Sequence, residues 1–413
     1  AAGSVLCGTA WNLEAMIAFR IVQAIPGGVI PVVALSMLYK IVPRERIGAA
    51  MGMYGLGIIV APAIGPTLGG YLVEYVDWRL IFFINVPIGI AGTIAAMIWL
   101  PSFGAGRPER FDLPGFAAIA SGLFALLLAL SEGESWGWTA YPTLILITYG
   151  ALALALFVVI ELEVDHPLLD VRVFASCAFS NSLLLISVIS MGLFGVLFYI
   201  PQMLQQHQGL GAFETGLLLL PQALVMAVLM PVAGRLYDRF GARWPAVTGL
   251  IVVAYGTYLL HDVTIDTPHS ELSWILGLRA AGIGLAMMPI MTGGLSSLAP
   301  DRVDGASAYN TVVQRSSSAI GLAAMTALMT AQQSQGYADR AGLVPPETGA
   351  AASSGGSVLE QYSMTRQLTS QVFDTSFSDL MLVTTGLTGV AVLLALLLPS
   401  GRPAAGGSRP VEV

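Results

Sequence analysis

Long runs of apolar residues fill most of this chain, and each is about as long as a membrane is thick. A run of about 18 or more apolar residues is long enough for a helix that crosses a bilayer. Hydrophobic residues make up 55% of the chain and charged residues only 10%, whereas soluble domains carry about 25% charged residues. Lipid suits this composition, and a chain that crosses lipid must satisfy its backbone hydrogen bonds internally. The sequence therefore predicts an all-α membrane protein.

The apolar runs predict eleven complete spans. They are expected at 13–40, 47–73, 79–100, 114–131, 139–161, 179–204, 213–234, 244–261, 271–298, 305–331 and 376–399. Residues 1–10 are predicted to be half of a further span. Residues 332–375 lack a sustained apolar run and predict a partly flexible outer loop. The tail from Ser400 is rich in Gly and Pro and is expected to be disordered.

The basic residues favour one orientation in the membrane. With the 40–47 loop in the cytoplasm, twelve basic residues fall on the cytoplasmic side and three on the outer side. The cytoplasmic twelve are Lys40, Arg44, Arg46, Arg107, Arg110, Arg172, Arg235, Arg239, Arg243, Arg302, Arg402 and Arg409; the outer three are Arg79, Arg340 and Arg366. Cytoplasmic loops of membrane proteins carry such an excess. A cytoplasmic C-terminus and a location in the cell (inner) membrane of a bacterium are therefore expected.

Two stretches of the chain resemble each other. FRIVQAIPGGVIP leads to PRERIGAA, and LRAAGIGLAMMP leads to PDRVDGAS. Four landmarks correspond at offsets of 257 to 259 residues: Arg20 with Arg279, Pro31 with Pro289, Pro43 with Pro300, and Gly48 with Gly305. An even number of spans separates the two copies, so both have the same orientation. Parallel repeats of this kind build two similar bundles with a substrate site between them.

GRLYDRFGAR, residues 234–243, lies at a predicted cytoplasmic turn between two spans. Its glycines allow helices to approach closely, and Asp238 can cap a helix start or pair with an arginine. The segment resembles the Gly-x-Leu-x-Asp-Arg-x-Gly-x-Arg loop of the major facilitator superfamily. The resemblance implies an inner-gate loop, and ordinary flanking charge is the alternative. The residues expected to form it are Gly234, Asp238, Arg239, Gly241 and Arg243.

GIIVAPAIGPTLGG, residues 57–70, repeats small residues at every fourth position. This spacing predicts a smooth stripe along which helix backbones pack closely, and Pro62 and Pro66 each permit a bend. The pattern resembles the antiporter signature of the superfamily, with Ala61 where that signature prefers Gly. Generic small-residue packing is the alternative. The expected hinge residues are Gly57, Pro62, Gly65, Pro66, Gly69 and Gly70.

FRIVQAIPGG, residues 19–28, resembles the Arg-x-x-Gln-Gly motif of the superfamily, with Ala24 in the usual Gly position. Arg20 is expected about 10 Å inside its span, counting about 1.5 Å for each residue from Leu13. A charge at that depth needs a partner. The resemblance links Arg20, with Gln23, to proton coupling, and a structural arginine bonded to backbone carbonyls is the alternative.

Two further segments predict a cavity lining. Residues 306–321 resemble the thirteenth helix of the fourteen-span drug:proton antiporters, and residues 197–209 resemble the ninth. The candidate residues are Tyr199, Gln205, Arg279, Asn310, Gln314 and Arg315. Bonds between helices alone would explain the same polar groups.

The resemblance implies a major facilitator fold with two pseudo-symmetric six-helix bundles plus two linker helices. We expect the remainder of the N-terminal bundle at 1–100, the linker helices at 101–173, the C-terminal bundle at 174–399 and a cytoplasmic tail at 400–413. The implied function is export of hydrophobic or amphipathic compounds in exchange for protons, without an enzyme activity, a cofactor or a metal. Expected partners are a small hydrophobic or cationic substrate, protons and membrane lipid, with no nucleic acid and a monomeric state. The alternatives are an exporter of a lipid, peptide or metabolite, and an integral membrane enzyme built on the acidic 161–170 stretch.

The spans hold arginines but no carboxylate near mid-membrane. A proton antiporter needs a titratable group within the membrane field. The repeat offset aligns Ala1 with a position near the end of the 244–261 span, and the second unit begins near Phe174. The difference predicts about 85 further residues before Ala1, enough for two full spans and most of a third. We therefore expect the chain to be N-terminally incomplete, with the proton-binding carboxylate in the preceding segment.

Overall fold

The computed structural model describes residues 1–100, 112–164, 169–299, 302–341 and 358–400, with side chains described except at 44, 59–63, 340–341 and 358–366. Within these ranges the chain consists of helices, short turns and one isolated β-bridge, between Gly241 and Ser400. The helices are α1 (Ala2–Gly8), α2 (Leu13–Ile41), α3 (Ile47–Tyr75), α4 (Leu80–Phe83), α5 (Asn85–Trp99), α6 (Leu113–Trp136), α7 (Tyr141–Glu163), α8 (Cys177–Gln202), α9 (Ala212–Phe240), α10 (Arg243–Leu259), α11 (His269–Ser296), α12 (Val303–Ala341) and α14 (Val358–Ala395).

Each predicted span coincides with helix. In the part of the chain that the structure describes, nine helical segments are long and apolar enough to cross a membrane, with α4 and α5 counted together. The all-α membrane fold is therefore confirmed, and the exact number of spans stays a prediction. The two predicted spans outside the nine are α3, whose central side chains are not described, and the more polar α12.

Several helices begin at a polar side chain that accepts a backbone N–H. Asn12 accepts from the amide of Ala15 at 2.8 Å, Asp112 from Gly115 at 2.9 Å, and Ser176 from Phe179 at 3.4 Å. The first amides of a helix have no partner within the helix, so such caps stabilise the start by about 1 kcal/mol each. These caps separate the long apolar runs into individual helices.

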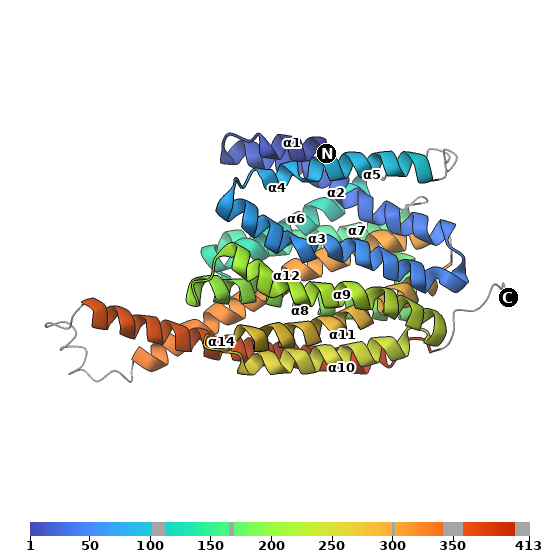
Figure 1. Ribbon diagram of the computed structural model, residues 1–413. Coiled ribbons are helices and arrows are strands. Elements are labelled where there is room, and N and C mark those ends of the chain that lie inside the picture. The colour runs from blue at the N-terminus through green and yellow to red at the C-terminus, as the bar shows by residue number, and fades with distance from the viewer. Residues whose placement is uncertain (101–111, 165–168, 300–301, 342–357, 401–413) are drawn as a thin grey trace.

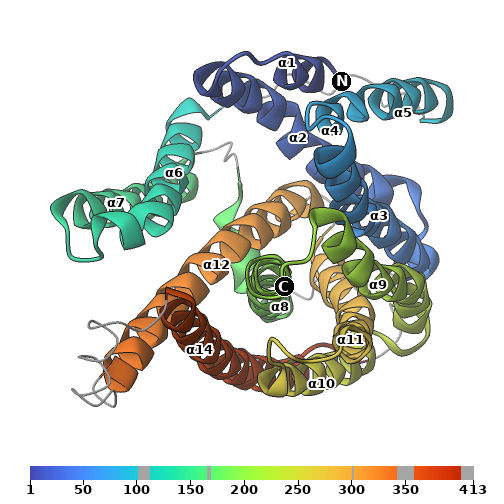
Figure 2. The same ribbon diagram turned by 60° about the vertical axis from the view of Figure 1, so that its left-hand side comes forward.

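The long helices lie side by side with their axes roughly parallel (Figure 1). α8 packs inside an arc formed by α12, α14, α10, α11 and α9, as Figure 2 shows. α3 packs along α9, and the α6–α7 hairpin packs against α12. α1, α4 and α5 cluster beside α2 at the edge of the molecule.

Burial differs between the two halves of the chain. In the most apolar stretch of α11, 83% of the residues are buried, whereas the share in α2 is 6%. Most of the large, fully buried side chains also belong to α8–α14, with Phe179 and Phe377 the largest. The packed core therefore sits in the C-terminal half, and α2 presents an apolar surface suited to lipid.

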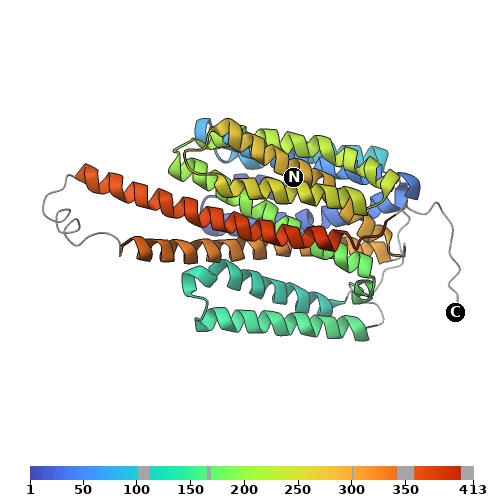
Figure 3. The ribbon, with the colours of Figure 1, turned by 90° about the horizontal axis from the view of Figure 1, so that it is seen from below.

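The predicted outer loop over 332–375 differs from the structure. α12 continues to Ala341 and α14 begins at Val358, so both helices extend beyond the rest of the bundle (Figure 3). These segments contain Ala, Gln and Leu, which favour helix, together with polar residues. Absence of an apolar run excludes a span but not a helix. Residues 342–357 of this prediction, and the tail from 401, lie outside the described residues.

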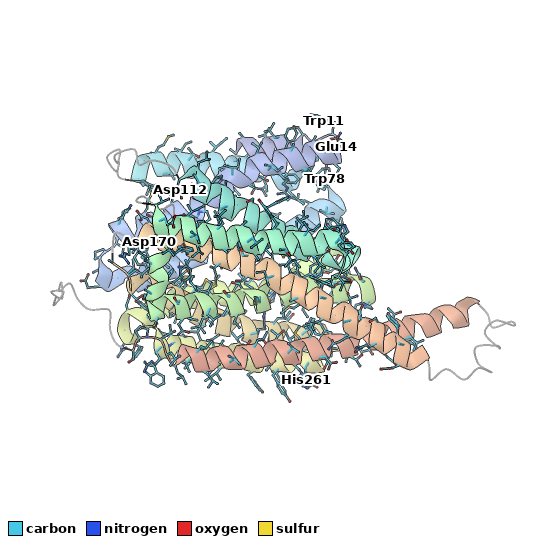
Figure 4. All side chains as sticks on the ribbon, turned by 180° about the vertical axis from the view of Figure 1, so that it is seen from behind. Trp11, Glu14, Trp78, Asp112, Asp170 and His261 are labelled. Atoms are coloured by element: carbon cyan, nitrogen blue, oxygen red, sulfur yellow. The ribbon has the colours of Figure 1, made fainter. Side chains whose placement is uncertain are left out.

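The connecting segments gather at two ends of the molecule. Figure 4 shows Asp112 and Asp170 toward one end of the helices, and Trp11, Glu14 and Trp78 toward the opposite end. The sequence places the first two residues in cytoplasmic segments and the last three at outer ones. The alternation of loops therefore agrees with the predicted order of crossings, while the sidedness itself stays a prediction.

Candidate functional site

The pair α3–α9 joins the first part of the chain to the C-terminal bundle along the length of both helices. A Cβ atom on Gly234 would lie 2.1 Å from the carbonyl oxygen of Gly48. Near the other end, a Cβ on Gly216 would lie 2.5 Å from the Cα of Thr67. Only glycine permits such backbone contact. The two helices are therefore antiparallel and in close contact near both ends.

Asp238, in the last turn of α9, caps the start of α3. Its Oδ1 accepts from the Gly48 amide and its Oδ2 from the Ala49 amide, both at 2.8 Å. α3 has no cap of its own, because the side chain of Arg46 at the N-cap position makes no capping bond. The carboxylate also faces the positive end of the α3 dipole. The structure thus shows the capping role that the sequence allowed for Asp238.

Three further bonds tie α2 to the C-terminal half at the same end. Lys40 Nζ donates to Asp304 Oδ2 at 2.7 Å in an exposed ion pair, and Ser36 Oγ donates to Asp304 Oδ1. Tyr39 donates its hydroxyl to the carbonyl of Thr292 at 3.3 Å. We call this the Asp238 end of the molecule. Both α2 and α3 are therefore fixed to the C-terminal half there.

The other residues of the predicted inner-gate loop have separate tasks. Gly241 ends α9 with a φ of +79°, a backbone conformation that favours glycine. Arg243 Nε donates to the carbonyl of Leu398 at 2.8 Å, which fastens the loop to the segment that follows α14. Arg239 is exposed, with its guanidinium 5.2 Å from the centroid of the Phe240 ring.

The opposite end of the pair is closed by Glu74, in the last turn of α3. Its Oε2 accepts from the backbone amide of Phe213, in the first turn of α9, at 3.1 Å. Thr67 Oγ1 donates to the carbonyl of Gly216 at 2.8 Å, and the rings of Tyr71 and Tyr75 pack edge-on against Phe213. We call this the Glu74 end. Each helix of the pair thus caps the start of the other with a carboxylate.

Sequence reasoning did not single out Glu74. A signal was available, because a carboxylate in the last turn of a helix faces the negative end of its own dipole. Such a residue is better placed when it can reach the start of a neighbouring helix.

The predicted close-packing stripe of α3 is wrong in its phase. A Cβ on Gly57, Gly65 or Gly69 meets no atom within 4 Å. The glycines of α3 in contact with α9 are Gly48, Gly52, Gly55 and Gly70, of which only Gly70 belonged to the predicted hinge residues. Four residues rotate an α-helix by about 400°, so a strict four-residue spacing drifts around it.

The proline part of the same prediction has a different outcome. Residues 47–75 form one continuous α-helix through both prolines. Pro66 is half-buried next to Thr67, and the side chain of Pro62 lies outside the described residues. The hinge function of this segment stays a prediction.

Arg20 lies within α2 with its side chain exposed, and its expected depth in the membrane stays a prediction. Its Nη1 donates to Gln23 Oε1 at 3.1 Å, and its guanidinium lies 4.6 Å from the centroid of the Phe82 ring. Gln23 Nε2 in turn donates to Ser4 Oγ at 2.8 Å. None of the ion pairs formed among the described residues includes Arg20. The motif residues Arg20 and Gln23 are therefore brought together, in a position open to further contacts.

Arg279, the repeat counterpart of Arg20, is 3% exposed. Its Nε donates to Thr257 Oγ1 at 3.0 Å and one terminal nitrogen donates to the carbonyl of Gly192 at 2.6 Å. These bonds link α11 with α10 and α8. Its donors hold three packed helices together, and the prediction that Arg279 lines a cavity stays a prediction.

The other cavity candidates lie on α8, on the turn that follows it and on α12. Tyr199 is buried and donates its hydroxyl to Thr326 Oγ1 at 3.1 Å, between α8 and α12. Asn310 is buried nearer the start of α12. Gln205 lies exposed in the π-helical turn Met203–His207, Gln314 is half-buried, and Arg315 is exposed. Their assignment to a substrate cavity stays a prediction.

The acidic 161–170 stretch stabilises local structure. Glu161 Oε2 accepts from the amide of Leu169 at 3.1 Å, and Asp170 accepts from the amide of Arg172 at 2.9 Å. Residues 165–168 lie outside the described residues. Among those described, no group of His, Cys, Asp and Glu side chains could hold a metal ion. These contacts favour a structural role for the stretch.

The architecture defines the chain as a multi-pass helical membrane protein. The sequence profile of the Major Facilitator Superfamily matches residues 1–322, and the chain belongs to this family. Two curated relatives are similar over most of the chain. The uncharacterized MFS-type transporter YhcA of Bacillus subtilis is 39% identical over 332 residues, which is 79% of this chain and 62% of that protein. The multidrug resistance protein B homolog of Mycobacterium tuberculosis is 31% identical over 334 residues, 80% of this chain and 62% of that protein.

A solved structure shows the same fold. The human organic anion transporter MFSD10 (TETRAN) superimposes with a TM-score of 0.57 at 14% identity, covering 94% of this chain and 74% of the other. The chain thus spans less than two thirds of the length of the two curated relatives and nearly all of it takes the superfamily fold.

Proposed function

We propose that this protein exports hydrophobic or amphipathic compounds across the cell membrane in exchange for protons, by alternating access. The α3–α9 pair carries the proposal, because each of its ends is closed by a carboxylate from one helix on the backbone of the other. Superfamily bundles rock against each other around a central site. The α3–α9 pair is held at each end by a few hydrogen bonds. This arrangement suits the rocking motion, because each bond is weak enough to break and re-form.

The energies of the bonds fit a reversible gate. A helix cap contributes about 1 kcal/mol, and a hydrogen bond to a charged group about 1.5–3 kcal/mol. Release of one end therefore costs an amount that substrate binding can supply. In the orientation that the basic residues favour, the Asp238 end faces the cytoplasm and acts as the inner gate.

Arg20 and Gln23 are the residues that we propose for proton coupling. Their exposed position leaves the guanidinium able to contact a carboxylate. We propose that the partner of Arg20 is a carboxylate of this protein that takes part in transport. Arg279 does not share this role, because its bonds hold the interior of the bundle.

The choice of substrate rests on the family and on the name of the mycobacterial relative, which is a multidrug resistance protein homolog. An exporter of a lipid, peptide or metabolite is the second candidate, because the same fold serves such compounds. The membrane enzyme has no comparable support, since Glu161 and Asp170 bind backbone amides.

Efflux from loaded vesicles tests the proposal. Proteoliposomes that contain the protein are loaded with ethidium, and an imposed pH gradient is expected to drive its release. An ionophore that collapses the gradient should stop release. Arg20→Ala should reduce gradient-driven release at least tenfold at unchanged abundance, while Asp262→Asn, an exposed residue between α10 and α11, serves as the control. Ethidium release that is the same with and without the pH gradient would contradict proton exchange. Normal release by Arg20→Ala would contradict the coupling role.

A further inference from the structure

A cavity of about 220 Å³ lies between the linker helix α6 and α12. Leu127 and Leu130 of α6 face Leu322 and Ala323 of α12 across it. Ser131, Glu134, Trp138 and Thr326 supply its polar and aromatic lining. The cavity thus has an apolar body and a single charged lining residue, which is a carboxylate.

Glu134 is held in place by α12. Its Oε1 accepts a hydrogen bond from Thr330 Oγ1 at 2.7 Å, across the gap between the two helices. No basic side chain lines the cavity, so the negative charge of Glu134 is not neutralised there by the protein. Gly133 packs against the ring of Trp138, where an added Cβ would lie 2.8 Å from ring atoms. This contact fixes the indole beside the carboxylate.

We propose that this cavity binds the head of an amphipathic organic ammonium compound. The carboxylate supplies the counter-charge, the indole face supplies a cation–π contact, and the leucines cover the adjoining alkyl groups. The cavity is smaller than the roughly 300 Å³ from which sites for whole drug-sized ligands begin. The cavity therefore holds the head alone, and the tail of the compound extends between the helices into the bilayer.

The position of the cavity gives it a place in export, and this step rests on the proposed function. The floor residue Thr326 accepts a hydrogen bond from Tyr199, which is buried in the C-terminal bundle. One lining residue of the cavity thus contacts a buried residue of the bundle directly. A compound held at Glu134 would wait beside the bundle before entering it from the membrane side.

A measurement of ligand binding tests this proposal independently of transport. The protein is placed in phosphatidylcholine nanodiscs, and binding of dodecyltrimethylammonium is measured by equilibrium dialysis, with empty nanodiscs as the blank. Glu134→Gln keeps the size of the side chain and an acceptor for Thr330, and we expect a Kd about tenfold higher, which corresponds to about 1.4 kcal/mol. Glu132→Gln, two residues earlier on the same helix and outside the lining, should change Kd less than twofold.

A second variant tests the cavity without touching the charge. Ala323→Leu fills part of the apolar body and should also weaken binding. An unchanged Kd in both Glu134→Gln and Ala323→Leu would overturn the proposal. Binding that is kept in phosphatidylcholine nanodiscs but lost in phosphatidylethanolamine nanodiscs would also overturn the proposal. The headgroup of a bilayer lipid would then be the occupant of the cavity. If binding depends on Glu134 but the protein shows no efflux, the result supports the binding site. It then counts against the proposed function only.

Discussion

The two ends of the α3–α9 pair use the same device with different strength. At the Asp238 end, one carboxylate accepts two backbone amides in a half-buried position. At the Glu74 end, an exposed carboxylate accepts one amide. The Lys40–Asp304 ion pair adds a further contact at the Asp238 end.

The difference indicates which end opens with less work. Two charge-assisted bonds shielded from solvent stabilise a contact more than one exposed bond does. Water can replace the single bond of Glu74 as soon as the aromatic rings around Phe213 separate. We therefore expect the Glu74 end to open more often than the Asp238 end in the state that the structure describes.

The largest expected effect comes from Gly234, at the Asp238 end. Gly234→Leu forces a side chain into the backbone contact with Gly48, where even a Cβ has no space. Overpacking of this kind costs about 1–3 kcal/mol or more, so we expect loss of efflux and a lower Tm. Gly92→Leu, in α5, is the matched control, since a Cβ there meets no atom within 4 Å. Equal behaviour of the two variants in a thermal unfolding assay would show that the close contact does not matter.

Asp238→Ala should give the next largest effect. Loss of both capping bonds removes about 1–2 kcal/mol, so the amides of residues 48 and 49 should exchange hydrogen at least five to ten times faster. Hydrogen–deuterium exchange with mass spectrometry measures this directly. Arg239→Gln, at an exposed neighbour, should leave the exchange unchanged. Unaltered exchange in Asp238→Ala would show that the cap does not hold the start of α3.

Glu74→Gln should have a smaller effect at the opposite end. The amide side chain still offers an oxygen, but the bond loses its charge and about 0.5–1 kcal/mol. Exchange at residues 212–216 should rise about two- to fivefold, with the Asp238 end unaffected. A larger rise than Asp238→Ala produces at its own end would reverse the ranking of the two ends.

Thr67→Val should have the smallest effect. The substitution keeps the shape of the side chain and removes one donor to the carbonyl of Gly216. That carbonyl lies within α9, where the helix itself offers it a donor. We expect exchange near Gly216 to rise less than twofold and efflux to remain normal. A rise in exchange as large as that of Glu74→Gln would show that the hydroxyl, and not the carboxylate, closes this end.

The sequence predicts the helices well because lipid imposes one requirement on every span. Apolar runs of sufficient length must be helical, and each predicted span is. The prediction failed at 332–375, where helices continue beyond their apolar parts. There the hydropathy pattern carried no information about structure outside the membrane.

The site was predicted in part. Asp238 could be predicted as a cap because its loop pattern is specific. Only the structure shows that its carboxylate accepts the backbone amides of Gly48 and Ala49. Arg20 and Arg279 are equivalent in the repeat, yet one is exposed and the other is buried. A repeat preserves residue type and helix position, whereas burial depends on the neighbouring helices. The same limit explains the wrong phase of the Gly57 stripe, since periodicity alone does not say which face meets α9.

Distances across the two ends of α3–α9 test the central claim that this pair is the moving joint of an exporter. In a background with Cys7→Ser and Cys177→Ser, spin labels are placed at positions 45 and 240 for the Asp238 end, and at 76 and 214 for the Glu74 end. Double electron–electron resonance is then recorded in nanodiscs with and without substrate at two pH values. The account predicts that one distance lengthens as the other shortens. Two distances that stay constant under conditions that support efflux would contradict it.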